Sequence, residues 1–131
     1  MNIFKRKKQP ELTEAQKKFN KLWDMYASGE LLKAEPRIYA LCDYEGGVNG
    51  EGHSGWFFNT ENSDGTEALQ TLILSLNGIL SDDLYANLNT AFKSYGTKDE
   101  ESICEKADEY YYEHEQEIEN ILQNYADTLT L

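Results

Sequence analysis

The sequence is poor in cysteine, in proline and in long apolar runs. Its 131 residues include two cysteines and two prolines. Two cysteines are too few for a disulfide framework, and we expect Cys42 and Cys104 to be buried, reduced thiols because both fall in apolar helical patterns. No stretch is long and apolar enough to cross a membrane. Residues 1–10 have no apolar segment after their basic residues, which argues against a secretory signal. We therefore expect a cytoplasmic protein.

Basic residues are also scarce, and most of them lie at one end of the chain. Residues 1–21 carry 7 basic and 2 acidic residues, whereas residues 22–131 carry 5 basic and 22 acidic residues, a net charge of −17. A body with this charge repels nucleic acid and anionic membranes and attracts basic proteins. We expect a flexible basic tail over residues 1–10, a single domain over residues 11–131, and a basic protein as partner.

Motifs that would support catalysis are missing. The sequence has no nucleophile motif, no phosphate-binding loop and no histidine pair at metal-ligand spacing. His53 lies near Glu51, and a base beside a carboxylate is the minimum for general acid–base chemistry. His114 falls on an apolar helical stripe, where a packed histidine is expected. We predict no enzyme, no cofactor and no metal, and retain as one alternative a small-molecule site lined by His53, Trp56 and Glu51.

Helical periodicity is the strongest positive signal. The chain is 40% hydrophobic and has 16 aromatic residues, which is enough for a core. No segment alternates convincingly with a period of two. The sequence predicts an all-α fold, a single compact domain of five to six helices with a long acidic C-terminal helix. Apolar residues recur at helical spacing over residues 13–29, 36–46, 67–77, 81–95 and 98–125.

A glycine-rich segment separates the second and third of these patterns. Residues 48–55 hold three glycines among polar residues, so we expect turns there, and a polar loop over residues 59–65. Between them, Trp56, Phe57 and Phe58 are too apolar to be left in solvent. We expect these three aromatic residues to enter the core.

This segment resembles the signature of a known family. Asn49 and Gly50 match its opening, Phe57, Phe58 and Asn59 match its close, and a leucine-rich helix follows. Over about residues 35–95 the sequence resembles a small bacterial domain family whose best-known member is an acidic DNA-mimic protein. The resemblance implies an all-α fold and no known catalytic activity. We interpret the motif as structural, with anchoring aromatic residues and with Asn59 bonded to the loop backbone; its residues are Asn49, Gly50, Gly55, Trp56, Phe57, Phe58 and Asn59.

The last helical pattern carries glutamates at every fourth position. On a helix each step rises about 6 Å, and like charges at this spacing repel by roughly 0.2–0.5 kcal/mol per pair. Lys106 is the single basic residue after residue 98. We predict that these glutamates begin opposite the apolar stripe and drift towards its flank. The stripe is Ile103, Ala107, Tyr110, His114, Ile118, Ile121 and Tyr125, and the glutamates, called the glutamate ladder below, are Glu101, Glu105, Glu109, Glu113 and Glu117.

Carboxylates and DNA phosphates both repeat every few ångströms, so the glutamate ladder suggests a function. Our first hypothesis is a non-enzymatic interaction protein, a DNA mimic that occupies the nucleic-acid site of a basic DNA-binding protein. The second is an immunity or antitoxin-like inhibitor of a basic toxin or nuclease. In either case Tyr111 or Tyr112 would serve as an exposed anchor. A homodimer is compatible with both, since a two-fold pair would lengthen the acidic track.

Overall fold

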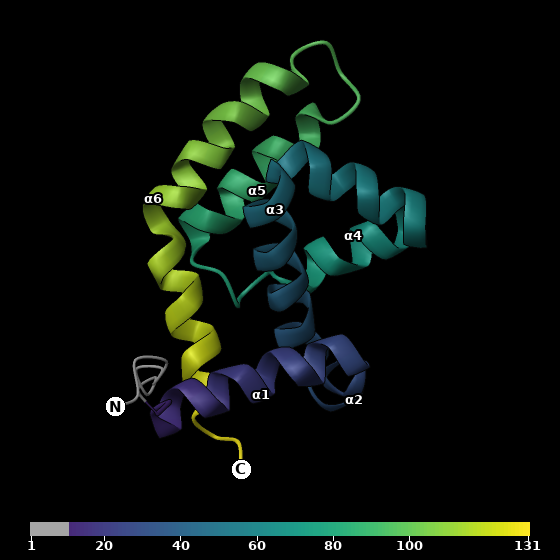
Figure 1. The fold of residues 1–131 in the computed structure, drawn as a ribbon. Coiled ribbons are helices and arrows are strands. Elements are labelled where there is room, and N and C mark those ends of the chain that lie inside the picture. Colours follow the sequence, from purple (N-terminus) through teal and green to yellow (C-terminus); the bar gives the residue numbers. More distant parts are fainter. Residues whose placement is uncertain (1–10) are drawn as a thin grey trace, which may run out of the picture.

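The computed structural model describes residues 11–131, which form six α-helices and no strand (Figure 1). The predicted all-α single domain with a long acidic C-terminal helix is therefore confirmed. The tail predicted over residues 1–10 lies outside the described residues. No helix among the described residues has the length and apolarity needed to cross a bilayer. The helices are α1 (Glu14–Ser28), α2 (Glu30–Ala34), α3 (Pro36–Asp64), α4 (Thr66–Ser75), α5 (Asp82–Ser94) and α6 (Glu100–Ala126).

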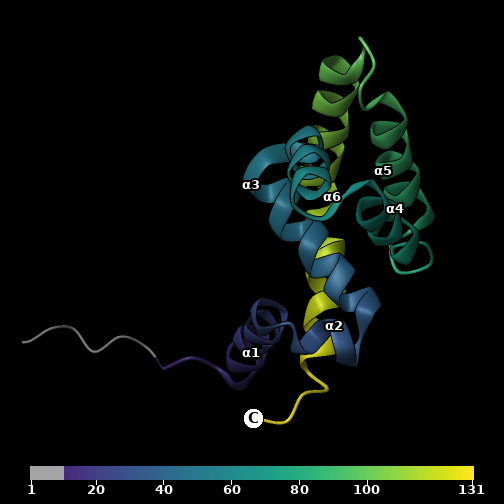
Figure 2. The same cartoon turned by 90° about the vertical axis from the view of Figure 1, so that its right-hand side faces the viewer.

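Helix α6 runs along one flank of the molecule and packs against α3, α5 and α1 (Figure 1). Its C-terminal end meets the beginning of α1, where Gln123 Nε2 donates to the Ala15 carbonyl at 3.2 Å and Lys18 Nζ donates to the Asp127 carbonyl at 3.3 Å. In Figure 2 the helices α1 and α2 lie at the end of the molecule where the chain terminates. The first and last helices thus close the fold against each other. The largest fully buried apolar side chains are Leu22, Leu31, Leu41, Tyr44, Phe57, Leu69, Leu76, Leu84, Leu88, Tyr111, Ile118 and Leu122.

Two helix starts follow local capping rules. Thr13 and Gln16 form a capping box before α1, and Gly29 ends that helix with a φ of 84°. Ser81 Oγ accepts from the Leu84 N–H at the start of α5. Each cap satisfies N–H groups that have no partner inside the first turn. The two cysteines, Cys42 and Cys104, are free and buried as predicted.

The prediction of turns over residues 48–55 is wrong. Helix α3 continues through Gly46, Gly47 and Gly50 and departs from helical geometry at a single residue, Gly52, whose φ is 72° and ψ 178°. Of the three helical glycines named, Gly47 is the one that the packing requires for space. A Cβ on Gly47 would lie 2.1 Å from Trp56 Cδ1, so the absence of a side chain lets the indole pack against the helix backbone. Close packing therefore overrides the low helix propensity of glycine.

The predicted polar loop over residues 59–65 is also wrong. Helix α3 extends to Asp64, and Gly65, with a φ of 97°, is the single residue between α3 and α4. Of the three aromatic residues expected in the core, Trp56 and Phe57 are buried but Phe58 is 56% exposed. Three consecutive residues on a helix point about 100° apart, so one element cannot bury all three on one face.

The apolar stripe of α6 is shifted by about one residue from its predicted position. Ala107 and Ile118 of the predicted stripe are buried, whereas Ile103, Tyr110 and Ile121 of the same stripe are half-buried. Both sets of positions are apolar, and the packing of α3 and α5 decides which set is deeper. The residues that are in fact buried are Cys104, Ala107, Tyr111, Ile118, Leu122 and Ala126.

Candidate functional site: the acidic face of α6

All five carboxylates of the glutamate ladder are exposed. The ladder comprises Glu101, Glu105, Glu109, Glu113 and Glu117, each with its side chain in solvent. The two ion pairs found within residues 11–131 are Lys18–Glu14 and His53–Asp108, and no ladder residue takes part in either. No side-chain hydrogen bond within the same residues involves a ladder carboxylate. The row therefore presents charge that the fold does not use.

The ladder winds around α6 instead of forming a straight row. Four residues overshoot one turn by about 40°, so the direction changes by about 160° between the first and last glutamates. Measured from the observed buried side, Glu101 lies on one flank, Glu109 and Glu113 lie on the back, and Glu117 lies on the other flank. The predicted drift from the back to one flank is therefore wrong, because the buried stripe is displaced. The exposed surface of α6 is a broad acidic band.

The tyrosines that interrupt these acids have three different environments. Tyr111 is fully buried, so it is not an exposed anchor. Tyr112 is 49% exposed, and its hydroxyl donates to the Val48 carbonyl at 3.2 Å. Tyr110 is half-buried and stacks on His114 with the ring centroids 4.0 Å apart. Tyr112 is thus the one tyrosine of the three that can place an aromatic face beside the acidic band.

His53 is fully buried and bonded on both sides. Its Nδ1 lies 2.6 Å from Asp108 Oδ1, and its Nε2 lies 2.6 Å from the Tyr44 hydroxyl. Burial raises the pKa of Tyr44 well above its usual value, so the phenol stays protonated. Its hydroxyl donates a hydrogen bond to Nε2. The same Asp108 oxygen accepts from the His53 backbone N–H at 2.9 Å. The kink at Gly52 divides α3 into a first arm before this glycine and a second arm after it. Asp108 thereby caps the start of the second arm.

The third hypothesis, a small-molecule site at His53, receives no support from this geometry. Glu51 is exposed and bonds Asn59, so it does not face the imidazole. None of the four surface cavities described below is lined by His53 or Glu51. The Tyr44–His53–Asp108 arrangement is enclosed, and its hydrogen bonds join α3 to α6. We interpret it as a structural junction.

Both asparagines of the motif donate to acidic side chains of α3. Asn49 Nδ2 donates to Glu45 Oε1 at 2.5 Å, four residues back on the same helix. Asn59 donates to the Glu51 side chain across Gly52. The expected bond from Asn59 to the loop backbone is therefore wrong, because the segment is helical and its backbone groups are already paired. At Gly55 a Cβ would lie 2.5 Å from the Cβ of Glu51, so the two arms approach closely here.

One group of carboxylates has the spacing of a metal site. Oxygens of Glu45, Glu115 and Glu119 lie within 4.8 Å of one another, the single such group among the described residues. Glu45 is buried, and its oxygens already accept from Tyr111 and Asn49. Its pKa is raised to about 7, chiefly by burial; the hydrogen bond and charge of Glu115 contribute to the rise, and the hydrogen bond from Tyr111 opposes it. The raised pKa of Glu45 favours a hydrogen bond between its carboxyl group and that of Glu115.

Sequence reasoning missed two acids with partners inside the fold, the buried Glu45 and the partly buried Asp108. Asp108 lies near the apolar stripe of α6, and Glu45 follows directly on buried Tyr44 in α3. An acid at the edge of an apolar helical stripe is the signal that would have found both, since a buried carboxylate needs partners. The partner of Glu45 is Tyr111, 66 residues away in the chain. The partner of Asp108 is the backbone N–H of His53, 55 residues away, which is free to be capped because of the kink at Gly52.

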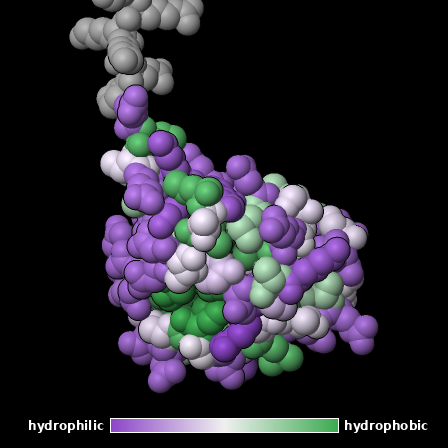
Figure 3. Space-filling view, turned by 90° about the horizontal axis from the view of Figure 1, so that it is seen from below, coloured by the Kyte–Doolittle hydropathy of each residue, from purple (hydrophilic) through white to green (hydrophobic). Residues whose placement is uncertain are grey.

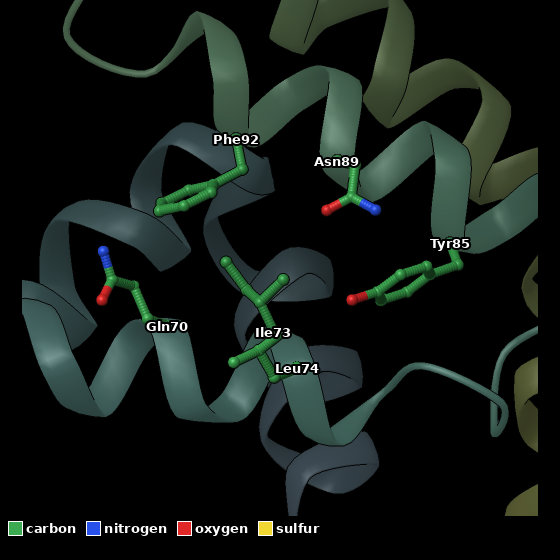
Figure 4. Close-up of a pocket in the computed structure, with 6 residues that line it drawn as sticks. All are labelled: Gln70, Ile73, Leu74, Tyr85, Asn89 and Phe92. Atoms are coloured by element: carbon green, nitrogen blue, oxygen red, sulfur yellow. The ribbon is translucent and has the colours of Figure 1, made fainter.

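None of the four described cavities is lined by a ladder residue, although the one beside Phe19 includes Gln116 and Glu119 of α6. The one in Figure 4 has about 270 Å³ between α4 and α5, with an apolar floor at Ile73 and with Tyr85 and Asn89 directed inward. Figure 3 shows the end of the molecule seen from below in Figure 1, mostly hydrophilic with a hollow where hydrophobic side chains gather. Two further cavities meet at Asp43 and Asp64, and the fourth lies beside Phe19. These openings are moderate in size and none contains a ladder residue.

Comparison with protein-family models, with curated proteins and with solved structures finds no match for this chain. The resemblance to the acidic DNA-mimic family therefore depends on the motif residues of the sequence alone.

Proposed function

We propose that this chain is a non-enzymatic interaction protein whose acidic α6 face binds a basic protein at the surface with which that partner binds nucleic acid. One observation carries the proposal. Five regularly spaced carboxylates are exposed, and within residues 11–131 none has a basic partner. A helix selected only for stability would place lysines between them, since mutual repulsion is unfavourable.

The charge of the whole body supports the same reading. Residues 22–131 carry a net charge of −17, so a cationic partner is attracted over several ångströms before contact. The band winds across the back of α6 with a rise of about 6 Å per glutamate, comparable to the few ångströms between phosphates. The half-exposed ring of Tyr112 lies on the same helix and offers an apolar contact inside a charged surface.

The test is a pull-down from a nuclease-treated extract of the native cell, with the chain immobilised. Nuclease treatment removes partners bridged by nucleic acid. We predict a basic protein that is retained at low salt, released by high salt and released by excess duplex DNA at constant salt. It should not be retained by the variant in which Glu105, Glu109 and Glu113 are replaced by Gln. Retention by this variant, or failure of DNA to compete, would count against the proposal.

A further inference from the structure

Two cavities on a different part of the surface meet at a pair of aspartates. The first has a volume of about 420 Å³ and the second about 370 Å³. Asp43 and Asp64 line both, so they stand at the junction. The rings of Tyr26 and Trp56 line the first cavity and Tyr39 lines the second. No residue of α6 contributes to either, so the site is separate from the glutamate ladder.

The shape of the first cavity follows from the sequence of α3. Gly46 and Gly47 form part of its wall, and the lack of side chains there leaves the space open. Trp56 is held beside it, because its Nε1–H donates to Asp43 Oδ2 at 3.0 Å. The other Asp43 oxygen accepts from the Tyr26 hydroxyl. These bonds fix the orientation of one carboxylate and two aromatic rings before any ligand arrives.

The charge at the junction is not compensated within the described residues. No lysine or arginine of residues 11–131 forms an ion pair with Asp43 or Asp64. Asp64 is the last residue of α3, where the helix dipole already places partial negative charge and disfavours an acid. Both aspartates contribute to raising the pKa of Tyr39, after the larger effect of burial. The fold thus tolerates an unfavourable negative field at this cavity.

We infer that the cavity at Asp43 and Asp64 binds an arginine side chain of a basic protein segment. A guanidinium group carries five N–H donors in a flat fork, so it can bond two carboxylates at once and lie against aromatic rings. The apolar second cavity, lined by Leu32, Ala68 and Leu72, accommodates the aliphatic stem or a neighbouring side chain of the same segment. A neutral or anionic ligand would leave the two aspartates uncompensated.

Trp56 supplies a direct reporter of this binding. The chain has two tryptophans, and the variant Trp23→Phe identifies the indole N–H signal of Trp56 in a proton–nitrogen correlation spectrum. The probe is the blocked tripeptide glycyl-arginyl-glycine, compared with the same tripeptide carrying glutamine or lysine. We expect the arginine peptide to move the Trp56 signal saturably, the lysine peptide to bind more weakly, and the glutamine peptide to leave the signal unchanged.

The matched variants remove one exposed charge each. Asp64→Asn should weaken arginine-peptide binding about two- to fivefold, the range expected for one exposed charged contact. Glu109→Gln, on the back of α6, should leave it unchanged. Equal effects of the two variants, or an equal shift with the glutamine peptide, would overturn the inference. The result is independent of the proposed function, because the peptide titration does not involve the glutamate ladder.

Discussion

At the residue scale, buried polar groups that are fully paired hold the two long helices together. No buried side-chain nitrogen or oxygen among the described residues lacks a hydrogen-bond partner. Asp108 is central to this pairing, because one of its oxygens accepts from both the ring and the backbone of His53. Removing one member of such a pair leaves the other buried without a partner, which is more unfavourable than losing the bond alone.

We predict that Asp108→Ala destabilises the chain by about 2–4 kcal/mol. It removes the cap of the second arm of α3 and leaves the His53 ring N–H unpaired in the core. Asp108→Asn retains an acceptor oxygen and should therefore destabilise the chain less than Asp108→Ala does. Urea unfolding followed by far-ultraviolet circular dichroism measures both. If the free energy of unfolding of Asp108→Ala lies within about 0.5 kcal/mol of the wild-type value, as is typical of substitutions at surface positions, this junction is not structural.

Glu45 makes the stability depend on pH. Its pKa is raised from 4.5 to about 7. Burial is the largest cause, the hydrogen bond from Tyr111 opposes it, and Glu115 and Glu119 add to the rise. A carboxyl whose pKa is higher in the folded state takes up its proton more readily there. Its favourable contribution is therefore present below about pH 4.5 and is lost as the pH rises through about 7.

We predict that Glu45→Gln removes the loss of stability that accompanies rising pH, because the amide is neutral and still accepts a hydrogen bond from Tyr111. Relative to the wild type, the variant should gain about 1–3 kcal/mol in free energy of unfolding between about pH 5 and pH 8. Urea unfolding of both proteins across this range gives the difference directly. A difference that stays constant with pH would show that Glu45 does not titrate in this window.

At the element scale, α3 shows why composition misleads. Its glycines predicted turns, yet the helix continues through all but Gly52. Gly47 is needed because a Cβ would meet Trp56, whereas Gly50 has no atom within 4 Å of the same position. The contact with Trp56 lies nine residues away, so no local pattern reveals which glycine is required for space.

These two glycines form a matched pair. Gly50→Ala should stabilise the chain by about 0.5–1 kcal/mol, since alanine favours the helix. Gly47→Ala should instead destabilise it by about 1–3 kcal/mol, because the methyl group displaces the Trp56 indole. Thermal unfolding of the two variants gives the comparison, and Trp fluorescence should change in the second alone. Equal stabilisation by both would mean that the indole can move at no cost.

Helix α6 shows the opposite case, where periodicity predicts the element and its bounds but not its orientation. Ile103, Tyr110 and Ile121 alternate with Cys104, Tyr111 and Leu122 as two adjacent apolar stripes. Which stripe is buried depends on how α3 and α5 pack, and the sequence of α6 does not contain this information. All five ladder glutamates remain exposed because the observed buried stripe is narrow and lies on the opposite side of the helix from Glu109 and Glu113.

We predict that the ladder is maintained at the expense of stability. Replacing Glu105, Glu109 and Glu113 by Gln removes four neighbouring like-charge pairs, so the variant should be more stable by about 0.8–2 kcal/mol at low salt. The gain should diminish at about 1 M salt, where charges on the surface are screened. Urea unfolding at both salt concentrations checks this. No gain at low salt would contradict the repulsion on which the functional argument depends.

At the scale of the whole molecule, the fold class, the uneven charge and the glutamate ladder were readable from the sequence, whereas the cavity at Asp43 and Asp64 and the junction at His53 were not. The all-α architecture follows from periodicity and caps, and the acidic body follows from counting residues. The two cavities at Asp43 and Asp64 are lined by residues of α1, α2, α3 and α4, and the junction at His53 depends on the kink at Gly52. Both arise from contacts between segments far apart in the chain.

The central claim is that the position of the ladder charges on α6, beyond the total charge, determines partner binding. The most direct measurement is the dissociation constant for the recovered basic protein at low salt with two triple variants of equal charge. One replaces Glu105, Glu109 and Glu113 by Gln, and the other replaces Glu11, Asp24 and Glu67, all exposed, by their amides. We predict a loss of about tenfold or more, about 1.4 kcal/mol, for the first and less than about twofold for the second. Equal losses in the two variants would contradict the claim, because total charge alone would then explain the binding.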